Sequence, residues 1–275
     1  TTTAAAAVLL PIIYLLIRAF GDGLSAWDPV FRLTTLETLG RTLLLGVSVT
    51  AASITLALPL AWLTTRSDLP LRRLWTLLTP LPLVVPSYVG AYLFASALGP
   101  RGLVQGWLEP LFGITRLPDI YGFPGALIVL TLLNYPFVLL SARAALLRID
   151  PAVEEAARSL GDNAWRAFWR VTFPQLRPAL ASGSLLVLLY VLRDFGAVSI
   201  MRYNTFTRVI YIQYQNSFDR QAAAALAVIL VLFSVIVLAL ETQARGRARL
   251  TGEGRGGRPP YRVALGRWRW PAFAF

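Results

Sequence analysis

Long apolar stretches alternate with short polar segments along the whole chain. A helix needs about 20 apolar residues to cross a hydrocarbon core of about 30 Å. Six stretches approach or exceed that length, and they cover residues 3–19, 42–65, 74–98, 123–147, 179–200 and 222–240. The pattern predicts an all-α polytopic membrane protein of about six transmembrane helices, with one transmembrane domain over residues 1–240. The first stretch is interpreted as a spanning helix rather than a signal peptide, because no basic segment precedes it.

The third and fourth predicted spans contain several prolines. They are Pro80, Pro82, Pro86, Pro124 and Pro136. Proline removes a backbone hydrogen bond and kinks a helix, and in a membrane the freed carbonyl needs another partner. We expect these two helices to pack in the core of the bundle, with ordinary kinks as the alternative.

Composition agrees with a membrane protein and removes several kinds of chemistry. Apolar residues make up 56% of the 275 residues, and Cys and His are both absent. Disulfides, thiolate or imidazole metal sites and catalysis by Cys or His are therefore excluded. All 26 basic residues are Arg. Without Lys the chain has no Walker A loop, so any ATP that drives its function is hydrolysed by another subunit.

The net charge of +12 does not indicate nucleic-acid binding, because the arginines flank apolar spans instead of forming a basic face. Seventeen arginines lie in the loop after the second predicted span, in the segment around residues 143–177 and in the tail, against six on the opposite side. Arg-rich short loops stay in the cytoplasm. The N-terminus and the C-terminal tail are therefore predicted to be cytoplasmic.

Residues 150–178, the polar segment, interrupt the apolar pattern. Asp150 and Pro151 are typical of a helix N-cap and first position, and Glu154 suits the positive end of the helix dipole. Gly161 predicts a helix end, because glycine adopts the left-handed conformation found there. The first helix of the polar segment should therefore end just before Gly161.

A second short helix is predicted after Gly161, capped by Asp162 or Asn163 and ending near Phe173-Pro174. Two such short helices need a surface on which to dock. Trp165, Phe168 and Trp169 share one face of the second helix, and Ala156 and Ala157 form a small-residue patch on the first. This surface either covers the protein's own bundle or docks a partner.

The spacing of the polar segment resembles a known motif. Residues 155–174 are similar to the EAA loop of the membrane subunits of binding-protein-dependent ABC importers. The matching positions are Glu155-Ala156-Ala157, then Gly161 after three residues, Val171 after nine more, and Phe173-Pro174 after one more. Val171 replaces the usual Ile and Phe173 the usual Leu. The resemblance implies the type I, MetI-like permease fold and a cytoplasmic loop of coupling helices.

The resemblance also implies a set of ATPase-coupling residues and partners. The coupling residues would be Glu155, Ala156, Ala157, Gly161, Trp165, Phe168, Trp169 and Pro174. The partners would be a cytoplasmic ABC ATPase dimer, which binds ATP and Mg, an extracytoplasmic substrate-binding protein and a second permease half. The chain itself would be a non-enzymatic subunit without a cofactor, in a bacterial inner membrane.

Residues 191–220 are similar to the matching part of ferric iron permeases, although thiamine, polyamine and sulfate permeases share much of this stretch. Such iron permeases often fuse two halves through a cytoplasmic linker. Residues 241–275 are accordingly expected to be an Arg-, Gly- and Pro-rich linker followed by the start of a further transmembrane helix. A homodimer or a chain that works alone is the alternative.

Asp194, with Arg193 and Tyr190, is the candidate for the translocation pathway, since a charge within the membrane is a functional hypothesis by default. Ferric ion favours carboxylate and phenolate oxygens, which Asp194, Tyr190, Tyr203, Tyr211 and Tyr214 could offer. No metal site is assigned. A structural role for Arg193 and Asp194, each with its own partner, is the competing interpretation.

Two other classes of membrane protein compete with a permease subunit. An intramembrane enzyme would need a Ser-His pair or two membrane aspartates, and the sequence has no His and one clear membrane Asp. A secondary transporter would suit kinked helices and a buried charge, but it leaves the spacing of the polar segment unexplained.

Overall fold

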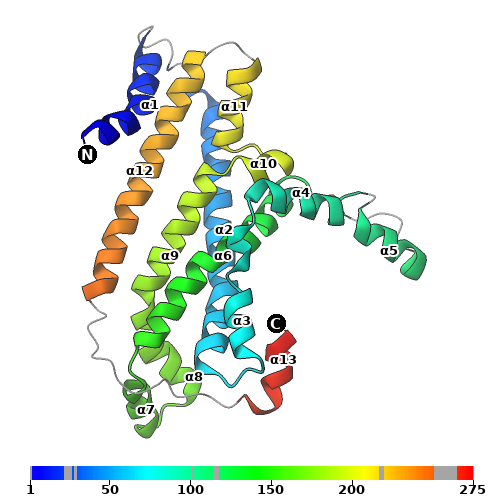
Figure 1. Cartoon of the computed structure of the whole chain (residues 1–275), viewed down its shortest axis with the longest axis vertical. Coiled ribbons are helices and arrows are strands. Elements are labelled where there is room, and N and C mark those ends of the chain that lie inside the picture. Colours follow the sequence, from blue (N-terminus) through cyan, green and yellow to red (C-terminus); the bar gives the residue numbers. More distant parts are fainter. Residues whose placement is uncertain are drawn as a thin grey trace. The chain divides into compact units, whose positions relative to one another are not determined.

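The computed structural model describes residues 2–21, 27, 30–100, 102–113, 118–216, 220–250 and 265–274. Within these ranges every regular element is a helix, which confirms the all-α prediction (Figure 1). The α-helices are α1 (Thr2–Phe20), α2 (Leu33–Arg66), α3 (Arg72–Leu78), α4 (Ser87–Leu98), α5 (Leu103–Phe112), α6 (Phe123–Arg148), α7 (Pro151–Ser159), α8 (Ala164–Ala167), α9 (Phe173–Arg193), α10 (Gly196–Ile200), α11 (Phe206–Asn216), α12 (Arg220–Leu250) and α13 (Arg269–Ala274).

Four helical runs in the described residues are long and apolar enough to cross a membrane. They are Leu33–Arg66, Phe123–Arg148, Ala164–Arg193 and Gln221–Gln243. The interrupted pair Arg72–Val84 and Ser87–Phe112 brings the number to 5 if it is counted as one span. The expected number of six spans is therefore not confirmed. The first expected span corresponds to a shorter apolar helix, Leu10–Phe20.

The third expected span is not one helix. After α3 the chain forms a short 3-10 turn, Leu81–Val84, and then becomes extended at Val85 before α4 begins. Pro80, Pro82 and Pro86 lie in or beside this interruption because proline cannot donate the hydrogen bonds that would continue a helix. Pro136 is buried within α6, whereas Pro86 and Pro124 are exposed. Core packing of the two proline-containing spans stays a prediction.

The chain divides into two compact units, which are described separately. Unit 1 comprises Thr1–Ser48, Pro86–Leu130 and Leu189–Val237, and unit 2 comprises Val49–Val85, Thr131–Leu188 and Leu238–Phe275. The four long helices α2, α6, α9 and α12 each contribute a segment to both units.

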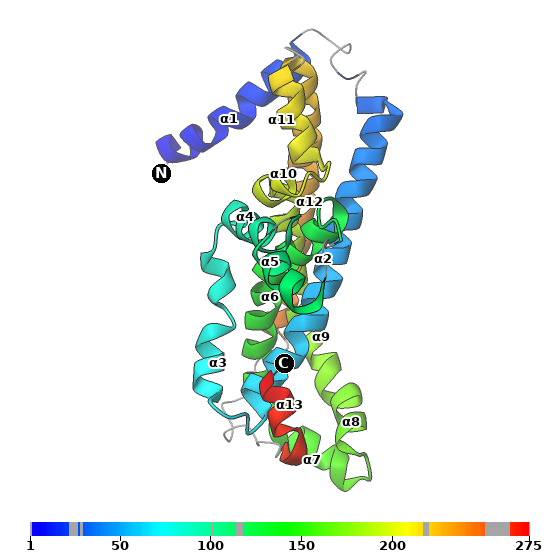
Figure 2. The same cartoon turned by 90° about the vertical axis from the view of Figure 1, so that its right-hand side faces the viewer.

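In unit 1, α10 packs tightly on α4. A Cβ atom added to Gly196 would lie 2.8 Å from Cβ of Tyr88, so only a glycine allows this approach. The backbone N–H of Phe206 donates a hydrogen bond of 3.0 Å to Oγ1 of Thr42, which fixes the start of α11 against α2. Figures 1 and 2 both show α1 and α11 next to the N-terminal part of α12.

In unit 2, α6 is the central element. A Cβ atom added to Gly183 of α9 would lie 2.8 Å from Cα of Val138, so the two helices cross at backbone contact. The other side of α6 holds the α3 region, where the Tyr135 hydroxyl donates a hydrogen bond of 2.7 Å to the carbonyl of Thr79. Helix α13 lies beside α3, with the rings of Trp75 and Phe273 5.6 Å apart (Figure 2).

Helix ends differ from expectation at three places. The predicted end of the second short helix near Phe173-Pro174 is wrong, since the helix continues into α9. Helix α9 ends at Arg193 instead of residue 200, because a separate helix, α10, begins at Gly196, and the side chain of Asp194 accepts a hydrogen bond from its first turn. Helix α12 continues past Glu241 to Leu250, so the segment expected as a linker from residue 241 begins within a helix. Residues 251–264 of that linker, together with Arg101 and Arg116 of the charge count, lie outside the described residues.

Candidate functional site

The polar segment begins as the sequence predicts. Asp150 is the N-cap of α7, and its side chain accepts a hydrogen bond of 2.9 Å from the backbone N–H of Ala152. Pro151 occupies the first turn, where a backbone N–H would have no acceptor within the helix, so its absence costs no hydrogen bond. Helix α7 therefore starts at a position fixed by two adjacent residues.

A tight turn ends α7. Gly161 has φ of +100°, a conformation that L side chains rarely adopt. The N–H of Gly161 donates to the carbonyl of Arg158 at 3.1 Å, and the N–H of Asp162 donates to the carbonyl of Ala157 at 3.2 Å. This pair of hydrogen bonds is a Schellman motif, which satisfies the last carbonyls of α7. The prediction that Gly161 ends the helix is confirmed.

The next helix is capped by Asn163, whose side chain accepts a hydrogen bond of 2.8 Å from the N–H of Arg166. Asp162, the other candidate cap, instead lies 3.8 Å from Arg166 and 3.5 Å from Arg170 as an ion-pair partner. The two candidates that the sequence left open thus have separate roles.

Helix α8 runs into α9 through a π-helical turn, Phe168–Thr172. The N–H of Phe173 donates to the carbonyl of Phe168, five residues earlier. Pro174, the following residue, has no N–H to donate, so the wider turn places the proline where the hydrogen-bond ladder is already interrupted. This geometry explains why Pro174 does not end the helix.

The aromatic residues of the polar segment form one cluster of four rings. Trp165 and Trp169 have ring centroids 5.5 Å apart, and Phe168 lies 5.4 Å from Trp169. Phe173, which was not predicted to belong to this aromatic surface, completes the cluster at 4.6 Å from Trp169. Trp165 is 70% exposed and Trp169 41%. Two large rings therefore remain available to a partner.

Helix α7 presents a second exposed surface. Glu155 and Ala156 are exposed and Ala157 is half-buried. Leu160, which the sequence analysis did not single out, is 90% exposed. Glu154 points the other way, because its Oε2 accepts a hydrogen bond of 3.1 Å from Oγ1 of the buried Thr172. The adjacent glutamates thus divide their roles: Glu154 fastens α7 to the π-helical turn, and Glu155 faces outward.

The pathway candidates are held by local contacts in unit 1. Oδ1 of Asp194 accepts hydrogen bonds from the N–H groups of Ala197 at 2.9 Å and Val198 at 3.3 Å. The guanidinium of Arg193 lies over the ring of Tyr190, 3.9 Å from its centroid. Asp194 also has a side-chain hydrogen bond with Ser87 of α4. Adjacent Arg193 and Asp194 therefore have different bonding partners, and Asp194 has a structural role in binding the first turn of α10, whose N-cap is Phe195.

The phenols considered as ferric-ion ligands also have separate partners. The Tyr203 hydroxyl donates a hydrogen bond of 3.2 Å to the carbonyl of Arg41. Burial raises the pKa of this phenol, and the charge of Arg41 partly opposes the shift. Tyr203 is thus a protonated donor at neutral pH. Within the described residues there is no group of three or more Asp, Glu, His or Cys that could hold a metal ion.

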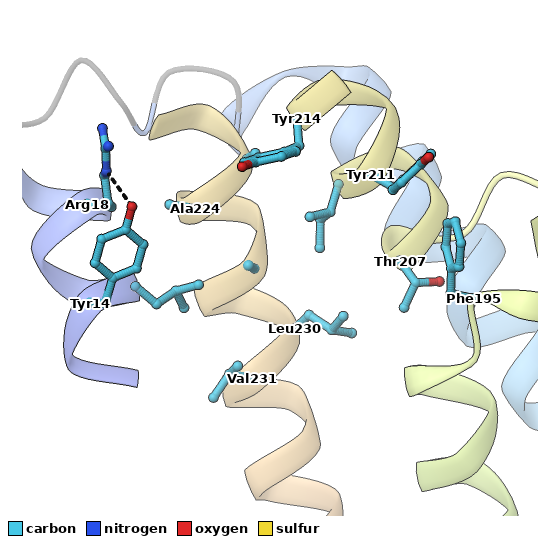
Figure 3. A pocket seen from close by; sticks show the side chains of 13 residues that line it. Tyr14, Arg18, Phe195, Thr207, Tyr211, Tyr214, Ala224, Leu230 and Val231 are labelled. Carbon is cyan, nitrogen blue, oxygen red and sulfur yellow. Dashed lines mark hydrogen bonds between the residues drawn. The ribbon is translucent and has the colours of Figure 1, made fainter. Parts of the chain in front are cut away.

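Tyr211 and Tyr214 line a cavity of about 510 Å³ between α1, α11 and α12 (Figure 3). Apolar side chains such as Leu230 and Val231 form much of its wall, and Nε of Arg18 donates to the Tyr14 hydroxyl at 3.1 Å at one side. The residues that line the cavity include the hydroxyls of Tyr14, Thr207, Tyr211 and Tyr214 but no carboxylate, which a hard cation also favours.

Residues 53–249 match the family described as "Binding-protein-dependent transport system inner membrane component". The chain belongs to this family. Members of this inner membrane component family are transport proteins and not enzymes. The matched region includes the whole polar segment and the pathway candidates.

Curated relatives differ in cargo. The chain is 34% identical over 218 residues to an Fe(3+)-transport system permease protein of Haemophilus influenzae, covering 79% of this chain and 39% of that protein. It is 32% identical over 161 residues to the molybdenum transport system permease protein of Escherichia coli, covering 57% of this chain and 69% of that protein. The chain thus spans well under half the length of the iron permease that it matches.

Solved structures support the fold. A bacterial ABC transporter that imports alginate matches with a TM-score of 0.62 at 20% identity, covering 90% of this chain and 95% of that chain. The MetNI methionine ABC transporter in an inward-facing conformation matches with a TM-score of 0.58 at 16% identity, covering 82% and 98%. The MetI-like type I permease fold expected from the sequence is therefore confirmed.

Proposed function

We propose that this chain is the membrane-spanning subunit of an ABC importer and that its polar segment couples it to a cytoplasmic ATPase dimer. The observation that carries this proposal is the geometry of residues 150–172. Two capped helices meet at the left-handed Gly161 and expose Glu155, Ala156 and two tryptophans. An exposed aromatic surface on a helical hairpin suits a groove on a partner protein.

The ATPase is assigned to a partner, which agrees with the absence of a Walker A lysine from residues 1–275. ATP and Mg are therefore assigned to the partner and no cofactor to this chain. We place the polar segment, the N-terminus and the tail on the cytoplasmic side of the inner membrane. A substrate-binding protein is assigned to the opposite side, and a second permease half, fused or separate, completes the pathway.

We propose ferric iron as the cargo. Support comes from the similarity of residues 191–220 to iron permeases and from the 34% identity to the iron permease of Haemophilus influenzae. Sulfate is the main alternative, because the chain is 30% identical over 199 residues to the sulfate permease CysW of Escherichia coli. Asp194 and Arg193 remain candidates for the pathway, although their local contacts favour a structural role.

The test is reconstitution with the cognate ATPase and binding protein, followed by uptake assays for ferric iron, sulfate and molybdate. We expect Gly161→Asp and Glu155→Lys to leave the protein in the membrane and to abolish coupling of ATP hydrolysis to uptake. Normal uptake in both variants would refute the coupling role. Uptake of sulfate but not iron would overturn only the choice of cargo.

The chain offers a matched control for each variant. Gly113, after α5, also has positive φ, at +68°, and like Gly161 has no atom within 4 Å of an added Cβ. Glu109 is an exposed glutamate on α5. Gly113→Asp and Glu109→Lys impose the same chemical changes outside the polar segment, so they should retain coupled uptake.

A further inference from the structure

Arg66, the last residue of α2, is a buried cation in unit 2. Its side chain is only 4% exposed. One terminal nitrogen, Nη2, donates hydrogen bonds of 2.9 Å to the carbonyl of Leu146 and 3.0 Å to the carbonyl of Ile149. These carbonyls lie in the last turn of α6 and at the residue that directly follows that turn.

The carbonyls that Arg66 binds belong to the end of a helix. The last carbonyls of a helix have no partner within the helix and carry the negative end of its dipole. A guanidinium is always charged, and it binds such oxygens more strongly than a neutral donor does. Burying a charge is costly unless it has such partners. Arg66 therefore joins α2 to the end of α6 at a defined point.

The contact lies at the entry to the polar segment. Ile149 is followed by Asp150, the N-cap of α7. The carboxylate of Glu154 on α7 also attracts Arg66 electrostatically, while it accepts a hydrogen bond from Thr172. Arg66 thus interacts with the residue before the N-cap of α7 and with a charge on α7 itself.

The end of α2 is suited to receive a displacement from α7. Oγ of Ser67, whose side chain is fully buried, donates to the carbonyl of Leu63 at 2.7 Å and accepts from the N–H of Leu69 at 3.3 Å. Buried groups that are hydrogen-bonded on both sides resist local rearrangement. If a movement of α7 displaces Arg66, the residues at the end of α2 around Ser67 would therefore move together as one unit.

We propose that Arg66 is a positioning residue that ties the entry of α7 to the end of α2, so that movement of the polar segment is passed to α2 as well as to α6. This inference rests on the proposed function, because it needs an ATPase that moves α7. A purely structural clamp would stabilise the fold and leave coupling unaffected, and this difference can be measured.

The first experiment compares Arg66→Gln with Arg73→Gln in the reconstituted transporter. Arg73 is an exposed arginine nearby in the sequence, so its variant loses the same charge without the buried contact. We expect Arg66→Gln to lower uptake about tenfold, the factor expected for loss of a charged hydrogen bond. The ATPase should still co-purify, and its hydrolysis rate should be retained. Arg73→Gln should behave as the unaltered chain.

The absence of cysteine allows a direct measurement of the link. Spin labels at Leu71→Cys and Val153→Cys, both exposed positions, report the distance between the residues after α2 and helix α7. With Arg66 present we expect that distance to be the same with and without ATP, because the two ends move together. In the Arg66→Gln background the distance should change when ATP binds.

Several outcomes would overturn the inference. Wild-type uptake with Arg66→Gln would refute the role of Arg66. The proposed function would still stand if Gly161→Asp uncouples ATP hydrolysis from uptake in the same assay. If Arg66→Gln does not accumulate in the membrane, Arg66→Lys is tested in its place. Full uptake by Arg66→Lys, together with a label distance that changes when ATP binds, would refute the link between α7 and the end of α2. Failure of both variants to fold would assign Arg66 a folding role only. Absence of any complex between the unaltered chain and an ATPase would refute the proposed function and this inference together.

Discussion

Gly161 follows α7 in the exposed polar segment, and Gly196 begins α10 directly after the break at the end of α9. At Gly161 the backbone has φ of +100°, and an added Cβ would meet nothing within 4 Å. At Gly196 an added Cβ would lie 2.8 Å from Cβ of Tyr88 and 3.0 Å from its backbone nitrogen. The first glycine is needed for its backbone conformation and the second for the absence of a side chain.

The surroundings of the two glycines show the same contrast. The polar segment is held by local caps and hydrogen bonds, and its large side chains are exposed: Leu160 is 90% exposed and Trp165 70%. The α10 region also has local hydrogen bonds, from the N–H groups of Ala197 and Val198 to Asp194, but both of these residues are fully buried against their surroundings. We therefore expect changes in the polar segment to impair coupling with little loss of stability, and changes at α10 to impair stability first.

The largest effect is expected for Gly196→Val. Its side chain would overlap α4, and overpacking of this kind costs about 1–3 kcal/mol or more. The thermal midpoint of the purified protein in detergent should fall by several degrees, since about 1 kcal/mol corresponds to roughly 2–4 °C in a chain of this size. Gly196→Ala should show a smaller loss in the same direction.

Gly40→Ala is the control for Gly196→Val. Gly40 is a helical glycine of α2 with nothing within 4 Å of an added Cβ. Alanine there should leave the thermal midpoint unchanged or raise it, because alanine favours the helix. An unchanged midpoint in Gly196→Val would mean that α10 and α4 do not pack as described.

An intermediate effect is expected for Gly161→Ala. A left-handed conformation costs an L residue about 1–2 kcal/mol, and in an exposed turn this strain is relieved by local rearrangement of α8. Uptake should therefore fall while the thermal midpoint of the protein stays nearly constant. Gly161→Asn should retain more uptake than Gly161→Ala, because asparagine tolerates this conformation better. Equal uptake in the two variants would argue against a backbone role for Gly161.

Local features of the polar segment were predictable from the sequence. The cap at Asp150, Pro151 in the first turn and the left-handed Gly161 depend on residues within a few positions of one another. The choice between Asp162 and Asn163 was not predictable, because both side chains can cap a helix. In the structure Asn163 caps the helix, and Asp162 pairs with the arginines at 166 and 170.

Features that depend on distant residues were not predictable. The contacts of Arg66 with Leu146 and Ile149 join positions 80 and 83 residues apart, and the sequence around Arg66 resembles any polar helix end. Continuation of the helix through Pro174 depends on the π-helical turn before it. Asp194 was expected within a span, but its side chain can also bind the first turn of a helix, and that local option ends α9.

The smallest effect is expected for Asp162→Asn, which separates the roles of charge and backbone in the turn. The arginine partners of Asp162 are 63% and 71% exposed, and exposed ion pairs contribute about 0–1 kcal/mol. Uptake and the thermal midpoint should therefore change little, and any difference from the unaltered chain should shrink at high salt, where such pairs are screened. If Asp162→Asn instead impaired uptake as strongly as Gly161→Ala, and salt reproduced the defect in the unaltered chain, the ion pairs would set the angle between α7 and α8. The left-handed conformation of Gly161 would then be a consequence of that angle and not its cause.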